Sequence, residues 1–294
     1  MLRASHRGGP GETTPADAPL PVSPVITLAG VSKHFQSTAA LHNVSATIPP
    51  GQFVVIIGRS GAGKTTLLHC LSRTTPVTAG SIRFGTCDLT SLHGEMLRQH
   101  RARVGMIYQQ FNLVKRLHVC DNVLVGRLPH LSGVAWWLAL GRYFPAAQRA
   151  IALRCLEHVS LLDRAWQRTD TLSGGEQQRV AIAKVLAQQP QVILADEPVA
   201  SLDLMNGALV MDTLRRVASE TGLTVIATLH HVEYARRYAD RVLGLRAGEL
   251  VFDGLPPALT DAALRSLFGA APLQSEPPAP TATLDTAWVA SSCE

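Results

Sequence analysis

Short apolar runs alternate along this chain with stretches whose apolar residues recur at helical spacing. Apolar runs occupy 53–57, 192–195 and 223–228. Runs that are apolar on both faces are typical of buried strands in a parallel sheet. Helical periodicity marks 146–162 and 205–219, where apolar residues return every three to four positions. Strands alternating with helices predict an α/β fold around a mainly parallel sheet.

Weaker patterns predict the remaining elements. We expect short strands at 25–28, 41–48 and 80–85, with a turn-rich segment at 29–40 between the first two. From about 94 to 171 the pattern is mainly helical, interrupted by a strand at 104–108, and it predicts a helical subdomain. Further helices are predicted at 174–189 and 231–238, and a closing antiparallel hairpin at 241–245 and 249–252.

Composition bounds the class of protein. The chain has 294 residues, 46% hydrophobic and 17% charged, as expected of a globular protein. Its net charge of +5 is spread in short basic groups, so no nucleic-acid surface is predicted. The five scattered cysteines indicate reduced thiols, without a zinc site or a disulfide framework. No apolar run approaches the ~20 residues that span a bilayer, so any membrane role is expected to be peripheral.

The two ends differ in composition from the middle. Residues 1–24 carry five prolines among small polar residues, which predicts a disordered leader. The central domain is expected over 25–254, and 255–294 is expected to hold a C-terminal helix and a disordered tail, Pro/Ala/Ser-rich past about Gly269.

The sequence after the first buried run carries a phosphate-binding pattern. Residues 58–65 read Gly-Arg-Ser-Gly-Ala-Gly-Lys-Thr and match G-x-x-x-x-G-K-[ST] between a strand and a helix. Its glycines let backbone N–H groups turn inward, and the following helix directs its positive end to the same place. Lys64 adds a charge for the β- and γ-phosphates, and the Thr65 hydroxyl is a ligand for Mg²⁺. A nucleoside triphosphate site is therefore predicted.

Two carboxylates follow the second buried run. Asp196 and Glu197 lie where ligands bind in open α/β sheets, at the C-terminal end of a strand. Adjacent carboxylates repel each other unless a cation is present. We expect Asp196 to hold Mg²⁺ and Glu197 to polarise the water that attacks the γ-phosphate.

A second candidate anion cradle opens the helix near 174. Leu172 to Arg179 reads Leu-Ser-Gly-Gly-Glu-Gln-Gln-Arg, with Ser173 placed as an N-cap and two glycines at the positive helix end. Alone, Ser-Gly-Gly usually means a turn.

Together these motifs, in this order and spacing, resemble the ATP-binding-cassette (ABC) ATPases over roughly 25–254. Leu-Ser-Gly-Gly is the signature of that family among P-loop enzymes. The resemblance implies a P-loop NTPase fold of the ABC ATPase type, with a helical subdomain and an antiparallel β subdomain. It also implies ATP and Mg²⁺ as cofactors, and a head-to-tail homodimer in which each ATP lies between one phosphate loop and the partner's signature.

The family's functional residues can be placed on this sequence. Phe35 resembles the aromatic residue that stacks on adenine, although a core Phe is the competing interpretation. Gln109 looks like the glutamine that senses Mg²⁺ and water, and Gln110 beside it is the alternative. Asp203 resembles the acidic residue that crosses the dimer interface, and His230 the switch histidine that donates to the γ-phosphate.

The complete set of expected site residues follows from these assignments. The expected catalytic residues are Glu197, His230, Gln109 and Lys64, and the expected metal ligands are Thr65, Gln109 and Asp196. The expected nucleotide-binding residues are Phe35, Gly58, Arg59, Ser60, Gly61, Ala62, Gly63, Lys64, Thr65, Thr66, Ser173, Gly174, Gly175, Glu176 and Asp203.

Three further stretches, 109–117, 195–203 and 240–248, resemble the ATPase subunits of phosphonate importers. That likeness implies import of phosphonate or a related phosphorus oxyanion, with two permease subunits, an indirect solute-binding protein and a place on the cytoplasmic face of the inner membrane. An importer of another solute, lipid or lipoprotein export, and a soluble nucleic-acid-binding ABC protein are the alternatives. Trp136, Trp137, Tyr143 and Phe144 are equally compatible with a permease contact and with packing.

Overall fold

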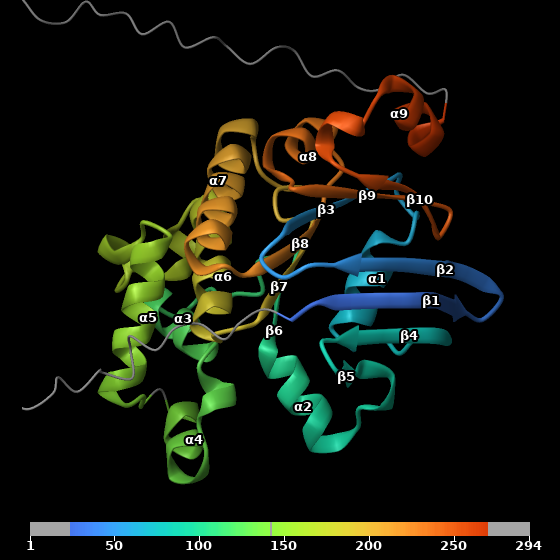
Figure 1. Ribbon diagram of the computed structural model, residues 1–294. Helices are drawn as coiled ribbons and strands as arrows, with labels where there is room; N and C mark the ends of the chain where they lie inside the picture. Colours follow the sequence, from blue (N-terminus) through green and yellow to red (C-terminus); the bar gives the residue numbers. More distant parts are fainter. Residues whose placement is uncertain (1–23, 142, 270–294) are drawn as a thin grey trace, which may run out of the picture.

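A six-stranded sheet forms the centre of the computed structural model, which describes residues 24–141 and 143–269 (Figure 1). Its strand order is β10-β9-β3-β8-β7-β6, all parallel except β10, which pairs antiparallel with β9. The mainly parallel core and the closing hairpin are both confirmed. The strands are β3 (Phe53–Ile57), β6 (Val104–Ile107), β7 (Val192–Asp196), β8 (Thr224–Thr228), β9 (Arg241–Arg246) and β10 (Glu249–Gly254).

A smaller antiparallel sheet has the order β2-β1-β4-β5. Its strands are β1 (Ile26–Phe35), β2 (Thr38–Ile48), β4 (Ala79–Phe84) and β5 (Cys87–Asp88). The turn-rich segment expected at 29–40 is wrong, since β1 continues to Phe35 and β2 begins at Thr38. Register shifts between Leu28 and His34 accommodate Gly30 at φ +59°, so pairing with β2 and β4 overrides the turn-like composition.

Helices pack on both sides of the larger sheet. In Figure 1, α1 lies between the two sheets, and α3, α4 and α5 gather at the end of the molecule away from α9. The helices are α1 (Lys64–Leu71), α2 (Gly94–Arg103), α3 (Val119–Val125), α4 (Gly133–Leu140), α5 (Ala146–His158), α6 (Gly174–Ala187), α7 (Leu204–Thr221), α8 (Val232–Tyr238) and α9 (Asp261–Phe268).

Strand β3 divides the apolar core in two, because successive side chains of a strand point to opposite faces. Phe53, Val55 and Ile57 pack with residues of α3, α5, α6 and α7. Val54 and Ile56 pack on the other face, with α1 and the smaller sheet. All five β3 side chains are buried, as the continuous apolar run predicts.

The structure describes some of the segments predicted from the sequence and not others. The leader and the tail past Gly269 lie almost entirely outside them, whereas α9 lies within the expected C-terminal helical region. Segment 94–171 contains α2 to α5, and α2 is joined to the end of α1 by a hydrogen bond between His100 Nε2 and the Leu71 carbonyl. Among residues 24–141 and 143–269, no helix is both long and apolar enough to cross a bilayer. The four cysteines in this part of the chain are free thiols.

One ion pair fastens α7 to the start of β3. Arg215 donates to both carboxylate oxygens of Asp240 at 2.7 and 2.8 Å, and the Phe53 N–H donates to the same carboxylate at 2.8 Å. Partial burial raises the pKa of Asp240, but the hydrogen bonds from Arg215 and Phe53 outweigh it, so this pKa lies below its ordinary value. The ionised carboxylate is therefore the form that stabilises the fold.

We expect Asp240→Asn to lower the melting temperature at pH 7 by about 1–4 °C, after allowing for solvent screening of this half-exposed pair. A depressed carboxyl pKa contributes stability above the unfolded value, and that contribution is lost as the pH falls through the folded value. The difference between the two proteins should therefore shrink in acid, below about pH 4. Glu233→Gln, on a carboxylate that is 82% exposed, is the control and should leave the melting temperature unchanged. A difference that is equal at pH 3 and pH 7 would contradict the assignment.

Candidate nucleotide site

The loop between β3 and α1 is packed so closely that two of its glycines admit no side chain. A Cβ on Gly58, at φ +154°, would lie 2.2 Å from the Leu245 carbonyl oxygen. A Cβ on Gly63, at φ +99°, would lie 2.4 Å from the Ala40 carbonyl oxygen. The loop backbone is thus held between β9 on one side and β2 on the other. The motif predicted from sequence is a tight backbone turn, with Arg59, Ser60 and Gly61 exposed on its outer side.

Lys64 turns its ammonium group back onto this loop. Its Nζ donates to the carbonyls of Gly58 and Arg59 at 3.0 and 3.2 Å, and the residue is only 4% exposed. Burial lowers the pKa of Lys64, while the negative charges of Glu197 and Asp196 act in the opposite direction. Among the hydrogen bonds of the described residues, none takes up the N–H of Gly61 or Gly63. An ammonium group and unused amide donors are the groups that bind phosphate oxygens.

Asp196 lies at the end of β7, directly opposite Thr65 and Thr228. Both hydroxyls donate to its Oδ1, Thr65 at 3.0 Å and Thr228 at 2.8 Å. The Thr228 hydroxyl also accepts the Glu197 N–H at 2.9 Å. Thr228 was not identified from the sequence, although its place at the end of the buried strand before His230 is a signal. Because β7 and β8 pair in parallel with Asp196 opposite Thr228, the two strand ends meet here.

Glu197 and His230 form the adjacent pair. Their Oε1 and Nε2 atoms are 2.5 Å apart, and the Glu197 side chain is 17% exposed. The Glu197 backbone has φ +49°, a left-handed conformation that is uncommon for this residue type and concentrates at functional sites. The structure thus places the phosphate loop, Asp196, Glu197 and His230 along one edge of the parallel sheet.

The oxygen groups of this edge suit Mg²⁺. Within the described ranges, no three His, Cys, Asp or Glu side chains form a metal cluster. Mg²⁺ is usually held by one or two carboxylates together with substrate phosphates and water, not by an all-protein cage. The Thr65 hydroxyl and the Asp196 carboxylate, already 3.0 Å apart, fit that pattern.

The Leu172–Arg179 turn belongs to a second group of residues, at the starts of α6 and α7. Ser173 caps α6 by accepting the Glu176 N–H, and the Glu176 carboxylate accepts the Ser173 N–H at 2.8 Å. That backbone hydrogen bond lowers the pKa of Glu176. A Cβ on Gly174 would lie 3.2 Å from Leu202, and one on Gly175 would lie 2.6 Å from the Asn206 amide oxygen.

Asp203 completes this second group. It caps α7, accepting the Asn206 N–H at 3.0 Å and the Asn206 side-chain amide at 2.6 Å. These hydrogen bonds lower the pKa of Asp203, which is exposed. The glycines of the Ser173 turn lie next to Leu202, Phe111 and Asn206, whereas the phosphate loop contacts β2, β7 and β9.

Two other expected residues stand apart on the surface. Phe35, at the end of β1, is 49% exposed, and the Lys33 ammonium lies 4.9 Å from the centre of its ring. A buried core Phe is excluded by this exposure. Gln109 and Gln110 are both exposed after β6, so their geometry does not choose between them.

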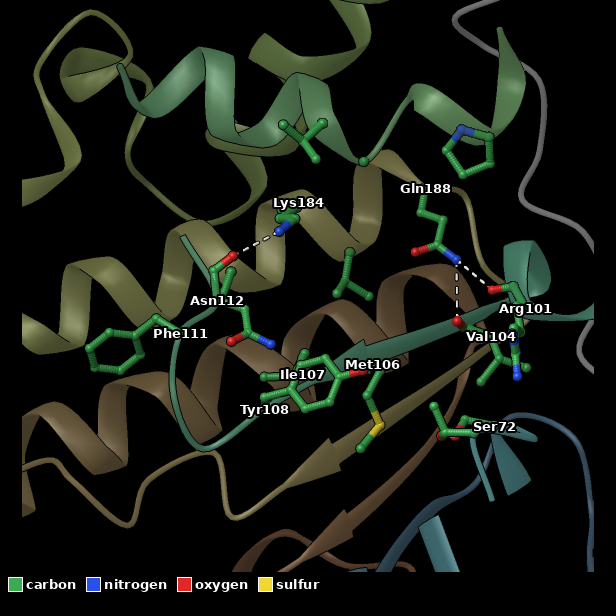
Figure 2. A pocket seen from close by; sticks show the side chains of 16 residues that line it. Ser72, Arg101, Val104, Met106, Ile107, Tyr108, Phe111, Asn112, Lys184 and Gln188 are labelled. Atoms are coloured by element: carbon green, nitrogen blue, oxygen red, sulfur yellow. Dashed lines mark hydrogen bonds between the residues drawn. The ribbon is translucent and has the colours of Figure 1, made fainter. Parts of the chain in front are cut away.

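A groove adjoins this glutamine pair. It has a volume of about 310 Å³ and lies between β6 and α6 (Figure 2). Tyr108 and Phe111 line one end, next to the glutamines, and Arg101 and Ser72 line the other. Lys184 donates to the Asn112 carbonyl at 2.9 Å across it. On α4, Trp137 is 70% exposed and Trp136 is 39% exposed.

Known proteins resemble this chain in sequence and in fold. Residues 41–200 match the family described as ABC transporter. The chain is 47% identical over 244 residues to the phosphonates import ATP-binding protein PhnC 2 of Rhodopseudomonas palustris, across 83% of this chain and 89% of that protein. It is 48% identical over 244 residues to PhnC of Bradyrhizobium diazoefficiens, across 83% and 90%.

Among solved structures, the chain is similar to the ATP-binding cassette MJ0796, a dimer bound to ADP and Pi in a post-hydrolysis state. The sequences are 32% identical, the TM-score is 0.68, and the match covers 79% of this chain and 98% of that one. The fold, the motifs and these likenesses agree, and the chain belongs to the ABC transporter family as an ATP-binding cassette.

Proposed function

We propose that this chain is the ATP-hydrolysing subunit of a phosphonate importer. The observation that carries the hydrolytic part is the meeting of Lys64, Asp196 and Glu197 at one edge of the sheet, around a loop with unused amide donors. Relatives named as phosphonates import ATP-binding proteins, at 47 and 48% identity, support the transport part.

ATP would bind with its triphosphate in the loop from Gly58 to Thr66. Lys64 would exchange its two carbonyl contacts for phosphate oxygens, because an ammonium group forms stronger hydrogen bonds with anionic oxygens than with amide oxygens. Phe35, at the tip of the β1–β2 hairpin, would stack on the adenine base. Because the Phe35 side chain is exposed and does not fill the core, its ring is available to contact a ligand.

Glu197 would act as general base on the attacking water. It takes the proton as the water oxygen bonds to the γ-phosphorus and the bond to the β-phosphate oxygen breaks, giving ADP and phosphate. His230 Nε2 lies 2.5 Å from the Glu197 carboxylate, and His230 would donate to the γ-phosphate once ATP is bound. Thr228 positions Asp196 and Glu197, because its hydroxyl donates to the Asp196 carboxylate and accepts the Glu197 N–H.

Thr65 and Asp196 would hold Mg²⁺, with Gln109 or Gln110 approaching from β6. When bound, the ion supplies positive charge that offsets the repulsion between the triphosphate and the two carboxylates.

A second copy of the chain would complete the site. Ser173, Gly174 and Gly175 would supply an anion cradle at the start of α6, where a Cβ on either glycine would meet Leu202, Phe111 or Asn206. In a head-to-tail homodimer, the cradle of one copy would face the γ-phosphate held by the other, with Asp203 at the interface. The similar MJ0796 cassette is a dimer bound to ADP and Pi, which supports dimer formation by this chain.

The permease would dock against the groove beside Gln109. Because the groove adjoins Gln109, the residue expected to sense the nucleotide, a permease bound there would respond to changes at the nucleotide site. Closure of the dimer would then be communicated to the two permease subunits. The chain would then act peripherally, on the cytoplasmic face of the membrane, and a solute-binding protein would contact only the permease. Differential affinity for ATP between open and closed dimers would drive transport.

Glu197→Gln tests the base assignment. The amide keeps the shape of the carboxylate but does not accept the proton, so we expect ATP hydrolysis to fall by about 10²–10⁴-fold while ATP binding persists. The amide also removes a negative charge beside the triphosphate, so ATP should hold the variant as a dimer in gel filtration. Asp253→Asn, on a carboxylate bound to Arg241 away from the site, is the control. Hydrolysis at the wild-type rate would refute the assignment.

Phosphonate transport is tested by reconstituting the chain in vesicles with the permease and the solute-binding protein of a phosphonate importer. Methylphosphonate with the binding protein should stimulate ATP hydrolysis and enter the vesicles, and phosphite, sulfate and an amino acid are the comparison solutes. Stimulation by phosphite alone would assign a related oxyanion. Stimulation by neither phosphorus compound would contradict phosphorus oxyanion import while leaving the ATPase assignment intact.

A further inference from the structure

The turn between β9 and β10 is fastened to the phosphate loop through one residue, Gly248. Its N–H donates to the Ala62 carbonyl at 3.1 Å, and its carbonyl accepts the His42 N–H of β2 at 2.8 Å. A single glycine therefore bridges the loop that precedes α1 and the strand that continues from the Phe35 hairpin.

Close packing makes this bridge rigid. A Cβ on Gly248, at φ +85°, would lie 3.0 Å from the Ala40 carbonyl oxygen and 3.2 Å from Leu41 Cα. The same Ala40 oxygen lies 2.4 Å from the position of a Cβ on Gly63. The Ala40 carbonyl is thus enclosed between the phosphate loop and the turn, and neither glycine can be replaced without displacing backbone.

The bridge fixes the direction of a neighbouring amide. A trans peptide is planar, and its C=O and N–H point in opposite directions. Because the Ala62 carbonyl points at Gly248, the Gly63 N–H of the same peptide points away from the turn. None of the hydrogen bonds among the described residues occupies that N–H, although it directly precedes the buried Lys64.

We propose that Gly248 is a positioning residue for nucleotide binding, which holds the Ala62–Gly63 peptide so that its N–H donates to the triphosphate. It acts through this peptide and does not touch the nucleotide. The hydrogen bond between His42 Nδ1 and Glu249 Oε1, 3.0 Å apart, seats the turn on β2. The inference rests on the proposed ATP site and adds a residue outside its motifs.

Gly248→Ala is the direct test, and Gly222→Ala is its matched control. Gly222, at φ +68° after α7, has the same left-handed backbone, but a Cβ there would meet nothing within 4 Å. Both variants should lose stability in thermal unfolding from backbone strain. Only Gly248→Ala should weaken binding of ATP and ADP, by about tenfold in calorimetric titration, as expected for one misdirected hydrogen bond to a charged group.

Two kinetic readouts separate this role from general destabilisation. KM for ATP should rise by about tenfold with kcat within about twofold, because the donor contacts the phosphates in both ground and transition states. ATP and GTP should lose affinity by the same factor, because the perturbed group binds phosphate and not the base.

A second variant guards against misfolding. The double substitution His42→Ala/Glu249→Ala removes an exposed pair and leaves Gly248 in place, and we expect a two- to threefold loss of ATP affinity. If Gly248→Ala unfolds, this variant decides the question. If Gly248→Ala folds and binds ATP with wild-type affinity, the proposal is overturned. If Gly248→Ala does not fold, wild-type affinity in the double variant overturns it. Failure of the wild-type protein to bind ATP would instead refute the nucleotide site itself.

Discussion

The burial of one positive charge, Lys64, at the edge of a parallel sheet is the constraint on which the site depends. Lys64 is 4% exposed as a residue, so its charge needs compensation, and it receives two loop carbonyls and the field of two nearby carboxylates. Each compensating group has a fixed origin: the carbonyls come from the tight turn after β3, and the carboxylates from the end of β7. The fold therefore brings these groups together before any ligand enters.

Close backbone packing and side-chain hydrogen bonds together maintain this arrangement. Gly58 is packed against β9 and Gly63 against β2, and Glu197 itself is held in a left-handed conformation. Thr228 joins Asp196 to the Glu197 backbone across the β7–β8 pair. Strain and close approach of this kind persist only where the surrounding structure determines them, which is why the site lies on central strands.

Much of this could be predicted from the sequence, because some signals are local. The apolar runs predicted the buried strands. The motif at Gly58–Thr65 and the two carboxylates after the second run predicted the residues at the sheet edge. The strand pairing that lengthens β1 to Phe35 could not be read from 29–40, since it depends on partners tens of residues away. Thr228 and Gly248 were missed for the same reason, because their importance arises from contacts between distant segments. The choice between Gln109 and Gln110 stays open, as both are exposed.

We propose that each nucleotide site needs a second copy of the chain. A crystal structure of the Glu197→Gln protein with ATP and Mg²⁺ is the decisive measurement. We expect a two-fold dimer in which the γ-phosphate contacts Lys64 of one copy, and Ser173 and the Gly174–Gly175 amides of the other. A nucleotide held at the phosphate loop with the Leu172–Arg179 turn of every copy far from the γ-phosphate would contradict it.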